Sequence, residues 1–427
     1  MGRALSIGVY SPFFGSTIGG GEKYLGVTAE TLRDAFPTAT IEIMSPVPAD
    51  PTRYEAMLGL HLDGITFRAT NAKPGRLKRA LATVPKLRLY RDLFVSAQAV
   101  RATADYDLLI SMVYVLPAFN RARRGVILCQ FPYERSINLR RQGALRLAHL
   151  LYSWPYKRVR RRLFGREIDD FQLVICQSEY VRRWVRELWG LDSEVVNPPI
   201  DVPSEEPDWA VKRPMIVSVG RFFTGGHSKR HDLMVQAFRE LCDEGCKGWE
   251  LHLAGSVHRD RAADLDYFNR LLRLADGYPV HIHTDATRET IENLYRRGSI
   301  YWHASGYGAD AERAPATLEH FGMTTAEAMG HGTVPVAIGR GGQVEVIREG
   351  LDGYLWTSIE ELKARTLRLM HDAPLRREMG ERARSASFRF SREEFKRRMA
   401  STVEPIIREL EQETQEIDLS AAAGAAR

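Results

Sequence analysis

Residues 318–346, LEHFGMTTAEAMGHGTVPVAIGRGGQVEV, decide the fold of this chain. One carboxylate, Glu319, precedes a Phe-Gly break, and a second, Glu327, lies in the helix-like run that follows. A short apolar strand at 333–339 and a glycine pair, Gly341 and Gly342, come next. In sheets of parallel strands joined by helices, ligands bind at the carboxyl ends of strands and against helix N-termini. The stretch is therefore typical of a ligand-binding α/β unit.

The helix start inside this stretch has two interpretations. A helix N-terminus offers unpaired amides and about half a positive charge, which suits a phosphate. Gly322 would let the backbone approach that phosphate, and Glu327, one turn into the helix, could accept hydrogen bonds from a ribose. Alternatively, Thr324 and Glu327 form a Thr-x-x-Glu capping box, which needs no ligand. Spacing alone leaves both interpretations open.

Strand-like and helix-like runs alternate along the rest of the chain, which predicts parallel sheets with helices on both faces. The strand-like runs of the first half are 4–10, 40–45, 106–112, 125–131 and 171–178. Those of the second half are 215–220, 249–255, 280–284, 299–305 and 333–339. Between the halves, the proline-rich stretch 194–214 has no periodicity and is typical of a linker. We therefore expect an α/β fold of two Rossmann-like, doubly wound parallel-sheet domains that face a central cleft.

The length of 427 residues suits two such domains. We expect an N-terminal domain at 1–200 and a C-terminal domain at 201–390. A further helix is expected at 391–417, where Ser391 and Glu394 form a capping box. The tail, 418–427, is expected to be disordered.

The net charge of +6 comes largely from two basic stretches, 73–101 and 140–162. In the second, arginines alternate with Leu, Tyr and Trp, a pattern that suits an anionic membrane surface or a phosphate-bearing partner. A solvated helix face is the ordinary alternative. We favour the membrane surface and expect no nucleic-acid partner. Nowhere do 18 apolar residues run together, so no membrane-spanning helix is expected.

The four cysteines, Cys129, Cys176, Cys242 and Cys246, lie in separate contexts without a CxxC pair. This spacing argues for a reducing compartment and against a cysteine-bound structural zinc. We expect a cytoplasmic protein.

Two cations lie at one predicted strand–helix crossover of the second half. Arg221 follows the strand-end glycine Gly220, and Lys229 begins the next helical run. Such a pair can neutralise a diphosphate without a metal, although it could also be an ordinary surface pair. Asp264 and Asp266 have the Asp-x-Asp spacing, but they lie inside a helical pattern. We therefore expect neither a metal nor a cofactor.

The first predicted crossover carries three consecutive glycines, Gly19, Gly20 and Gly21, followed by Glu22. This is not a Walker A loop, because Gly21 occupies the position of the lysine, and it is not Gly-x-Gly-x-x-Gly. The glycines allow a backbone-amide loop that faces the cleft. A tight strand–helix turn would need only one of them.

With these motifs the chain resembles the retaining glycosyltransferases of family 4, which have the GT-B fold, over most of its length. Glu319 and Glu327 correspond to the E-x7-E motif of that family, and Arg221 and Lys229 to its cation pair for the donor diphosphate. ICQSEYVRRWV and VVNPPID are similar to its segments before and within the linker, and residues 19–22 to its glycine loop. YWHASGYG is similar to bacterial members and to mannosyltransferases that act on lipid-linked oligosaccharides. Gln130 occupies the position where many members have a histidine, which argues against histidine-assisted activation of the acceptor.

The resemblance implies a metal-independent, retaining hexosyltransferase that uses GDP-mannose or a UDP-hexose. Its acceptor would be a lipid-linked or polysaccharide glycan at the inner face of a membrane, and the helix at 391–417 would cross back to the N-terminal domain. Glu319, Arg221 and Lys229 would be the catalytic residues, Gln130 would be the acceptor-side candidate, and residues 19–22 would form the glycine loop of the N-terminal domain. The donor-binding residues would be Glu327, Phe321, Gly322, Met323, Thr324 and Gly220. Two alternatives are a non-catalytic sugar-nucleotide-binding subunit and a nucleotide-sugar epimerase on the same fold.

Overall fold

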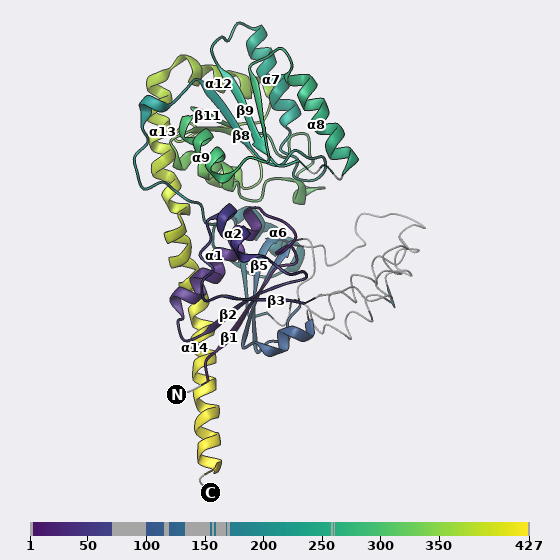
Figure 1. Cartoon of the computed structure of the whole chain (residues 1–427), viewed down its shortest axis with the longest axis vertical. Coiled ribbons are helices and arrows are strands. Elements are labelled where there is room, and N and C mark those ends of the chain that lie inside the picture. The colour runs from purple at the N-terminus through teal and green to yellow at the C-terminus, as the bar shows by residue number, and fades with distance from the viewer. Residues whose placement is uncertain are drawn as a thin grey trace. The chain divides into compact units, whose positions relative to one another are not determined.

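The protein divides into two compact units in a computed structural model, drawn in Figure 1. The structure describes residues 3–70, 100–114, 119–132, 154, 155, 158, 168, 171–257, 259 and 261–425. Unit 1 consists of residues 1–177, 181–196 and 396–427, and unit 2 of residues 178–180 and 197–395. Each unit is built around one sheet, and the described strands of each sheet pair in parallel.

The sheet of unit 1 has the strand order β3-β2-β1-β4-β5-β6-β7. Its strands are β1 (Ser6–Tyr10), β2 (Thr40–Ser45), β3 (Thr66–Ala69), β4 (Leu108–Tyr114), β5 (Arg124–Phe131), β6 (Leu173–Cys176) and β7 (Glu194–Val195). Its described helices include α1 (Gly20–Ala35), α2 (Pro51–Leu58), the short η2 (Thr103–Asp105) and α6 (Glu179–Trp189), whose first two residues belong to unit 2. The five strands that the sequence predicts here are confirmed. β3 and β7 were not predicted, because β3 lacks an apolar run and β7 is only two residues long within the predicted linker.

The sheet of unit 2 has the order β10-β9-β8-β11-β12-β13. Its strands are β8 (Met215–Val219), β9 (Glu250–Gly255), β10 (Val280–Thr284), β11 (Ile300–His303), β12 (Val334–Ile338) and β13 (Tyr354–Trp356). Its helices are η3 (Trp209–Val211), α7 (His231–Asp243), α8 (Ala262–Ala275), α9 (Arg288–Arg297), η4 (Pro315–Thr317), α10 (Met323–Gly330), α11 (Gln343–Val346), α12 (Ile359–His371), α13 (Ala373–Ser387) and η5 (Phe388–Phe390). The five strands predicted for this half are confirmed, and the three-residue β13 was too short to predict.

Helices cover both faces of the unit 2 sheet. On one face, Ile216, Leu251 and Leu253 pack into one cluster with apolar residues of α7, α8 and α12. On the other face, Val217 and Ala254 pack with residues of α9 and α10. A strand that is buried on both faces has apolar residues at successive positions. The sequence pattern therefore predicts such strands.

In each unit the chain reverses its direction of winding beside the first strand. Unit 1 has β2 on one side of β1 and β4 on the other, and unit 2 has β9 and β11 on either side of β8. In doubly wound sheets this switch point is where ligands bind, outside the carboxyl ends of the strands. The glycine loop follows β1 and the Arg221–Lys229 loop follows β8, so both predicted motifs lie at a switch point.

The last helix, α14 (Arg392–Ala425), begins in unit 2, and its residues from Lys396 onward belong to unit 1. Ser391 Oγ accepts a hydrogen bond from the Glu394 amide at 3.2 Å, as expected of an N-cap. In unit 1, Lys396 Nζ lies 2.8 Å from Asp34 Oδ2. The helix continues to Ala425 and so includes most of the tail for which we expected disorder; that tail is rich in alanine, the strongest helix former.

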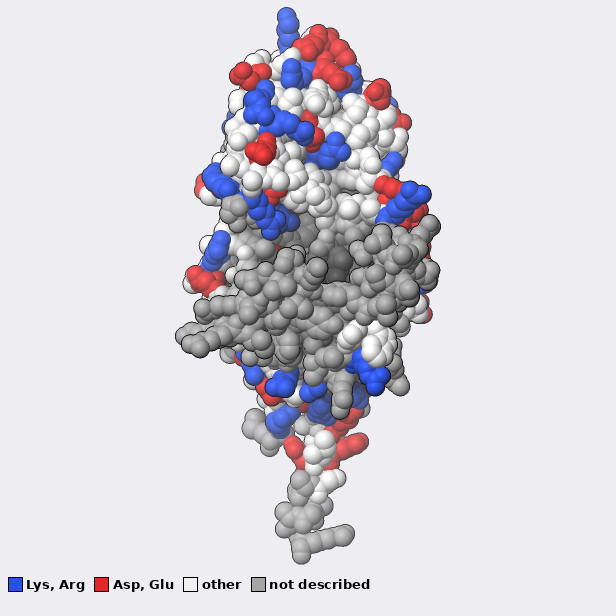
Figure 2. Space-filling model, turned by 90° about the vertical axis from the view of Figure 1, so that its right-hand side faces the viewer, with Lys and Arg blue, Asp and Glu red and all other residues white. Residues whose placement is uncertain are grey.

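Charged side chains of both signs are mixed over the described surface that Figure 2 shows. The basic stretches 73–101 and 140–162 fall largely outside the described residues, so the membrane contact stays a prediction from the sequence. Within the described part of the chain, no helix is both long enough and apolar enough to span a bilayer.

Candidate active site

A cluster of ionisable side chains lies at the carboxyl ends of β8 and β11 in unit 2. Lys229 ends the loop after β8, His303 is the last residue of β11, and Glu319 precedes α10. Lys229 Nζ donates to Glu319 Oε2, and His303 Nε2 lies 3.0 Å from the same oxygen. The Lys229 and Glu319 side chains are each 17% exposed, and that of His303 is 1% exposed. Folding thus brings a cation, a carboxylate and an imidazole from three separate segments into one largely buried site.

The protonation states of this cluster follow from its contacts. Burial would raise the pKa of Glu319, but the charge of Lys229 and the hydrogen bond with His303 outweigh it and hold that pKa well below its usual value. Burial lowers the pKa of His303, although Glu319 opposes this effect. At neutral pH, Glu319 is therefore an ionised hydrogen-bond acceptor, and it has no proton to donate as a general acid.

Two sets of glycines make room for the cluster. A Cβ on Gly220 would lie 2.4 Å from Lys229 Cγ, so the absence of a side chain lets the lysine stem cross the end of β8. Gly341 has φ +62°, and a Cβ there would lie 2.2 Å from the carbonyl oxygen of Glu319. The amide of Gly342 donates to that carbonyl at 2.8 Å. The close approach of the glycine pair is therefore to the backbone that carries Glu319.

The start of α10 contradicts the capping-box interpretation. The N-cap is Gly322, with φ 109°, and no side chain caps this helix. Thr324 lies inside the first turn, where its Oγ1 forms a 2.8 Å hydrogen bond with the Tyr301 hydroxyl. Thr324 and Glu327 are thus not a capping box, because the left-handed glycine starts the helix before Thr324. Because the N-cap is a glycine, it offers no side-chain oxygen to the first amides of α10, which suits an anion-binding N-terminus.

Not every predicted donor-binding side chain is available to a ligand. The Phe321 side chain is 2% exposed and packs against Phe390, with ring centroids 5.0 Å apart. Met323 packs against the same apolar cluster. We had expected both near the donor, but the structure places the Phe321 side chain in the core, where only its backbone could meet a ligand. Apolar residues beside a helix start are needed to pack the helix against the sheet. The sequence pattern around Glu319 and Glu327 does not distinguish residues with this packing role from residues that bind a ligand.

Arg221 lies on the same loop as Lys229 but is exposed. Its guanidinium carbon lies 5.2 Å from the ring centroid of Phe223. Burial lowers the pKa of His227 to about 4, and the charges of Lys229 and Arg221 act in the same direction while Glu319 opposes them. Both predicted cations and Glu319 therefore act on one buried imidazole. The roles of Arg221 and Lys229 toward a diphosphate stay a prediction.

Glu327 shares Tyr301 with Glu319 as a neighbour but also interacts with residues of α9. Burial raises the pKa of Tyr295, on α9, and of Tyr301, on β11, and the charge of Glu327 contributes to both shifts. It also helps to raise the pKa of Arg288 at the start of α9. The second acid of the motif thus lies beside α9 and β11. The two carboxylates are suited to separate parts of one ligand.

Two residues of this site were not predicted. His303 is a polar residue at the end of a strand, a position that parallel sheets commonly use for binding, so YWHAS did carry a signal. Gln343 carried none. Its side chain is fully buried, and a Cβ on Gly322 would lie 2.5 Å from its Nε2. Neither its amide nitrogen nor its amide oxygen has a hydrogen-bond partner among the described residues. Asp264 lies inside α8, as expected, and accepts a 2.9 Å hydrogen bond from the amide of Thr224 in the cation loop.

In unit 1 the structure brings the glycine loop and Gln130 together. A Cβ on Gly21 would lie 2.5 Å from Gln130 Nε2. Along the β4–β5 ladder, Val113 pairs with Cys129 and Tyr114 with Phe131, so Gln130 is the extra residue of a bulge. Bulges beside functional sites redirect a side chain. Gly19 and Gly20 lead into α1, where the Glu22 carboxylate accepts a hydrogen bond from Thr17 Oγ1.

Comparisons with known proteins agree with this architecture. Residues 201–386 match the family described as glycosyl transferases group 1. The chain is 25% identical over 256 residues to GDP-Man:Man(3)GlcNAc(2)-PP-Dol alpha-1,2-mannosyltransferase of Dictyostelium discoideum, covering 55% of this chain and 48% of that protein. The protein of the same name in Homo sapiens is 28% identical, with 55% and 49% covered. The chain thus spans about half the length of the curated relatives that it matches.

Among solved structures, Anabaena Alr3699/HepE in complex with UDP-glucose superposes with a TM-score of 0.62 at 17% identity. The match covers 94% of this chain and 100% of that one. At this identity the likeness speaks for the fold alone, and it agrees with the two parallel sheets described above. The chain therefore has the GT-B fold, and its residues 201–386 are similar to the group 1 glycosyl transferases.

Proposed function

We propose that this protein is a retaining glycosyltransferase. It moves a hexose from a nucleoside-diphosphate sugar, GDP-mannose or a UDP-hexose, to a lipid-linked or polysaccharide acceptor. The observation that carries the proposal is the buried Lys229–Glu319–His303 cluster at the switch point of unit 2, beside the uncapped start of α10. The GDP-mannose-dependent names of the curated relatives and the UDP-glucose complex of a structural neighbour support the donor class.

The chemical task of this site is to stabilise the leaving group. The acceptor hydroxyl oxygen bonds to the anomeric carbon on the face from which the nucleoside diphosphate departs. The bond from that carbon to the phosphate oxygen breaks, and the hydroxyl proton passes to the departing diphosphate. Lys229, Arg221 and the first amides of α10 would stabilise the charge that develops on the phosphate. One such fixed donor typically contributes a factor of about 10²–10³ in kcat.

The carboxylates have separate tasks in this proposal. Glu319, ionised and fixed by Lys229 and His303, would accept hydrogen bonds from hydroxyls of the transferred sugar. Glu327, beside α9, would accept from the ribose hydroxyls. No step requires a metal or a cofactor, because the positive charges at the diphosphate come from side chains and a helix N-terminus.

Gln130 and the glycine loop of unit 1 would contact the acceptor. The acceptor is lipid-linked in this proposal, and the chain works at the cytoplasmic face of a membrane, where the basic stretches 73–101 and 140–162 would contact anionic lipid. These two points depend on the sequence and on the names of the relatives.

A transfer assay tests the proposal. Purified protein is given a panel of GDP- and UDP-hexoses with a lipid-linked glycan acceptor, and the anomeric configuration of the product is determined by NMR. We expect transfer with retention from one donor. Glu319→Gln should remain folded and lose turnover, whereas the exposed Glu378→Gln, also in unit 2, should behave as the wild type.

Other outcomes would identify the alternatives. If Glu319→Gln retains full biological function and no transfer occurs, the chain is a binding subunit. An altered sugar nucleotide in the absence of acceptor indicates an epimerase, and an inverted product contradicts the retaining mechanism.

A further inference from the structure

Four side chains that take no part in the proposed transfer gather at the edge of the unit 2 sheet. Glu250 and His252 lie two residues apart on β9, and His281 and His283 lie two residues apart on the edge strand β10. Residues two apart on a strand share a face. The register pairs His252 directly with His281, so all four side chains are on one face of the sheet. This is the face that carries α9 and α10, since Leu251, Leu253, Val280 and Ile282 pack on the opposite side.

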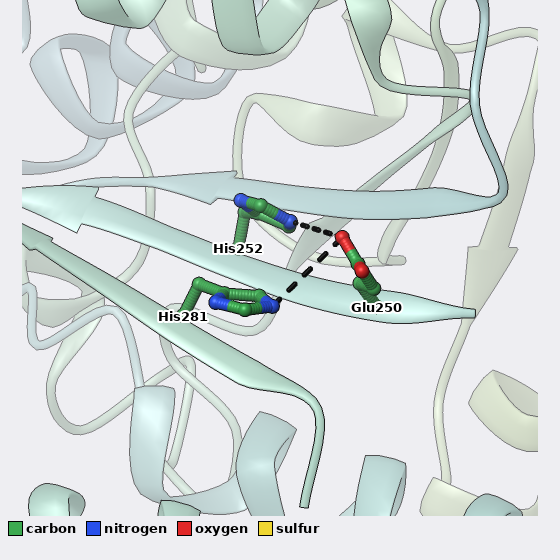
Figure 3. A group of neighbouring side chains, drawn as sticks. All are labelled: Glu250, His252 and His281. Atoms are coloured by element: carbon green, nitrogen blue, oxygen red, sulfur yellow. Dashed lines mark hydrogen bonds and ion pairs between the residues drawn. The ribbon is translucent and has the colours of Figure 1, made fainter. Parts of the chain in front are cut away.

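The ligand atoms of three of these residues converge. His252 Nε2 lies 3.0 Å and His281 Nε2 3.8 Å from Glu250 Oε2, as Figure 3 shows. One ligand atom from each residue lies within 4.8 Å of the others. Around a tetrahedral zinc ion with bonds of about 2.0–2.1 Å, ligand atoms lie about 3.3–3.4 Å apart. The two distances to Glu250 fall on either side of that value, so small side-chain rotations would bring the atoms into coordination geometry.

His283 completes the arrangement. Its Nε2 lies 3.0 Å from His252 Nδ1. When His252 donates its Nδ1 proton to His283, its Nε2 is left as a lone-pair donor directed at the same point as Glu250. Metal-binding histidines usually donate their second ring N–H in this way, and the partner fixes both the tautomer and the ring orientation.

We propose that Glu250, His252 and His281 bind one divalent transition-metal ion of the zinc class, with His283 as the residue that positions His252. Two imidazole nitrogens and one carboxylate oxygen suit Zn²⁺, Ni²⁺ or Cu²⁺ rather than Mg²⁺, which prefers oxygen ligands. Glu250 is 51% and His281 47% exposed, so an ion can enter from solvent and water can occupy the fourth position. Bound there, it joins the edge strand β10 to β9.

One cation lies near the cluster. Arg297, the last residue of α9, interacts with the charge of Glu250. Because Arg297 is a cation, it competes with the metal for that carboxylate.

The site is distinct from the donor site. Glu250 is the first residue of β9, whereas Gly255, the last, is so close to Gly220 that a Cβ on it would lie 2.0 Å from the Gly220 carbonyl oxygen. The cluster therefore begins at the end of β9 opposite the cation loop. Metal binding and sugar transfer should be separable, and this inference does not depend on the proposed function.

The test uses the full chain, freed of any purification tag and stripped with EDTA. Isothermal titration with ZnCl₂, followed by dialysis and elemental analysis, should give one tightly bound ion per chain, and MgCl₂ should give none. His252→Ala and His281→Gln should lose this ion. His283→Ala should weaken the affinity by about 10–100-fold, the usual effect of removing an outer partner of a ligand. Arg297→Gln should strengthen it.

Controls make the result decisive. His371→Gln removes an exposed histidine from the end of α12 and should bind zinc as the wild type does. Circular dichroism of each metal-free variant checks its fold, and because His281 is on the surface, its replacement should leave the fold intact. Wild-type protein that binds no zinc, or a folded His281→Gln variant that retains the ion, would overturn the proposal.

Discussion

The two units are wound in the same way but differ in the loop at their switch points. Unit 1 has the order β3-β2-β1-β4-β5-β6-β7 and unit 2 the order β10-β9-β8-β11-β12-β13. After the first strand, unit 1 places three glycines and Glu22, whereas unit 2 places Arg221 and Lys229. The common winding creates a ligand position in each sheet. The loop chemistry then favours the diphosphate in unit 2, because Arg221 and Lys229 supply positive charges that the glycine loop lacks.

The units also differ in their histidines. Unit 2 has buried His231, His303 and His320 near the cation loop. Among the described residues of unit 1 there is one histidine, His61, and it is exposed. Unit 2, for which we propose donor binding, should therefore also respond to acid more strongly than unit 1.

The largest expected effect comes from removing the cation that unit 1 lacks. Lys229→Gln should reduce kcat by about 10²–10³-fold, the typical loss when one fixed donor to a developing charge is removed. Steady-state kinetics of the wild type and the variant measures this fall in kcat. Lys247→Gln, an exposed lysine outside the cation loop, is the matched control.

A loss of turnover could also arise because Glu319 is left as an uncompensated charge. Thermal stability separates the two causes, because Glu319→Gln is by itself expected to abolish turnover. The double variant Lys229→Gln/Glu319→Gln should recover any thermal stability that Lys229→Gln loses. A Lys229→Gln protein that is as stable as the wild type but inactive supports the catalytic role, whereas a loss of turnover that only accompanies unfolding would mean that Lys229 only stabilises the fold.

The next effect concerns the acid response of unit 2. His227 has a folded-state pKa of about 4, below the ordinary histidine value. Between about pH 6.5 and pH 4, His227 is protonated in the unfolded chain but stays neutral in the folded protein. The free energy of unfolding of the wild type therefore falls as the pH is lowered through this range, by at most about 1.4 kcal/mol per pH unit. His227→Asn should flatten this slope; asparagine tolerates the positive φ of 65° at this position. Urea unfolding at several pH values measures the slope, and identical slopes would contradict the assignment.

The smallest effect tests unit 1. Gly21→Ala should displace the flexible end of Gln130, and Gln130→Ala removes it. If Gln130 donates to the acceptor, each change should raise the acceptor KM about fivefold, equivalent to about 1 kcal/mol for one hydrogen bond. The double variant should be no worse than either single one, because both act on the same contact. Donor affinity should not change in any of them, and a change there would contradict the division of tasks between the units.

Sequence reasoning predicted those features that a local pattern of residues determines. Strand-like runs predicted ten strands, which the structure confirms, whereas the site indicated by charges at strand ends stays a prediction. Sequence reasoning left the helix start open, because Thr324 matches the capping box in spacing, and the structure rules out that interpretation by making Gly322 the N-cap. Its prediction of Phe321 at the donor now concerns the backbone alone, because the side chain packs in the core. It could not predict contacts that depend on register or on distant segments, such as Gln343 against Gly322 or His252 opposite His281.

Titration of the protein with GDP- and UDP-sugars, with EDTA present throughout, is the most direct test of the donor site. The account predicts saturable binding of at least one sugar nucleotide without any divalent ion, and much weaker binding by Lys229→Gln. Failure to bind every donor in the panel, or binding that appears only when Mg²⁺ or Mn²⁺ is added, would contradict it.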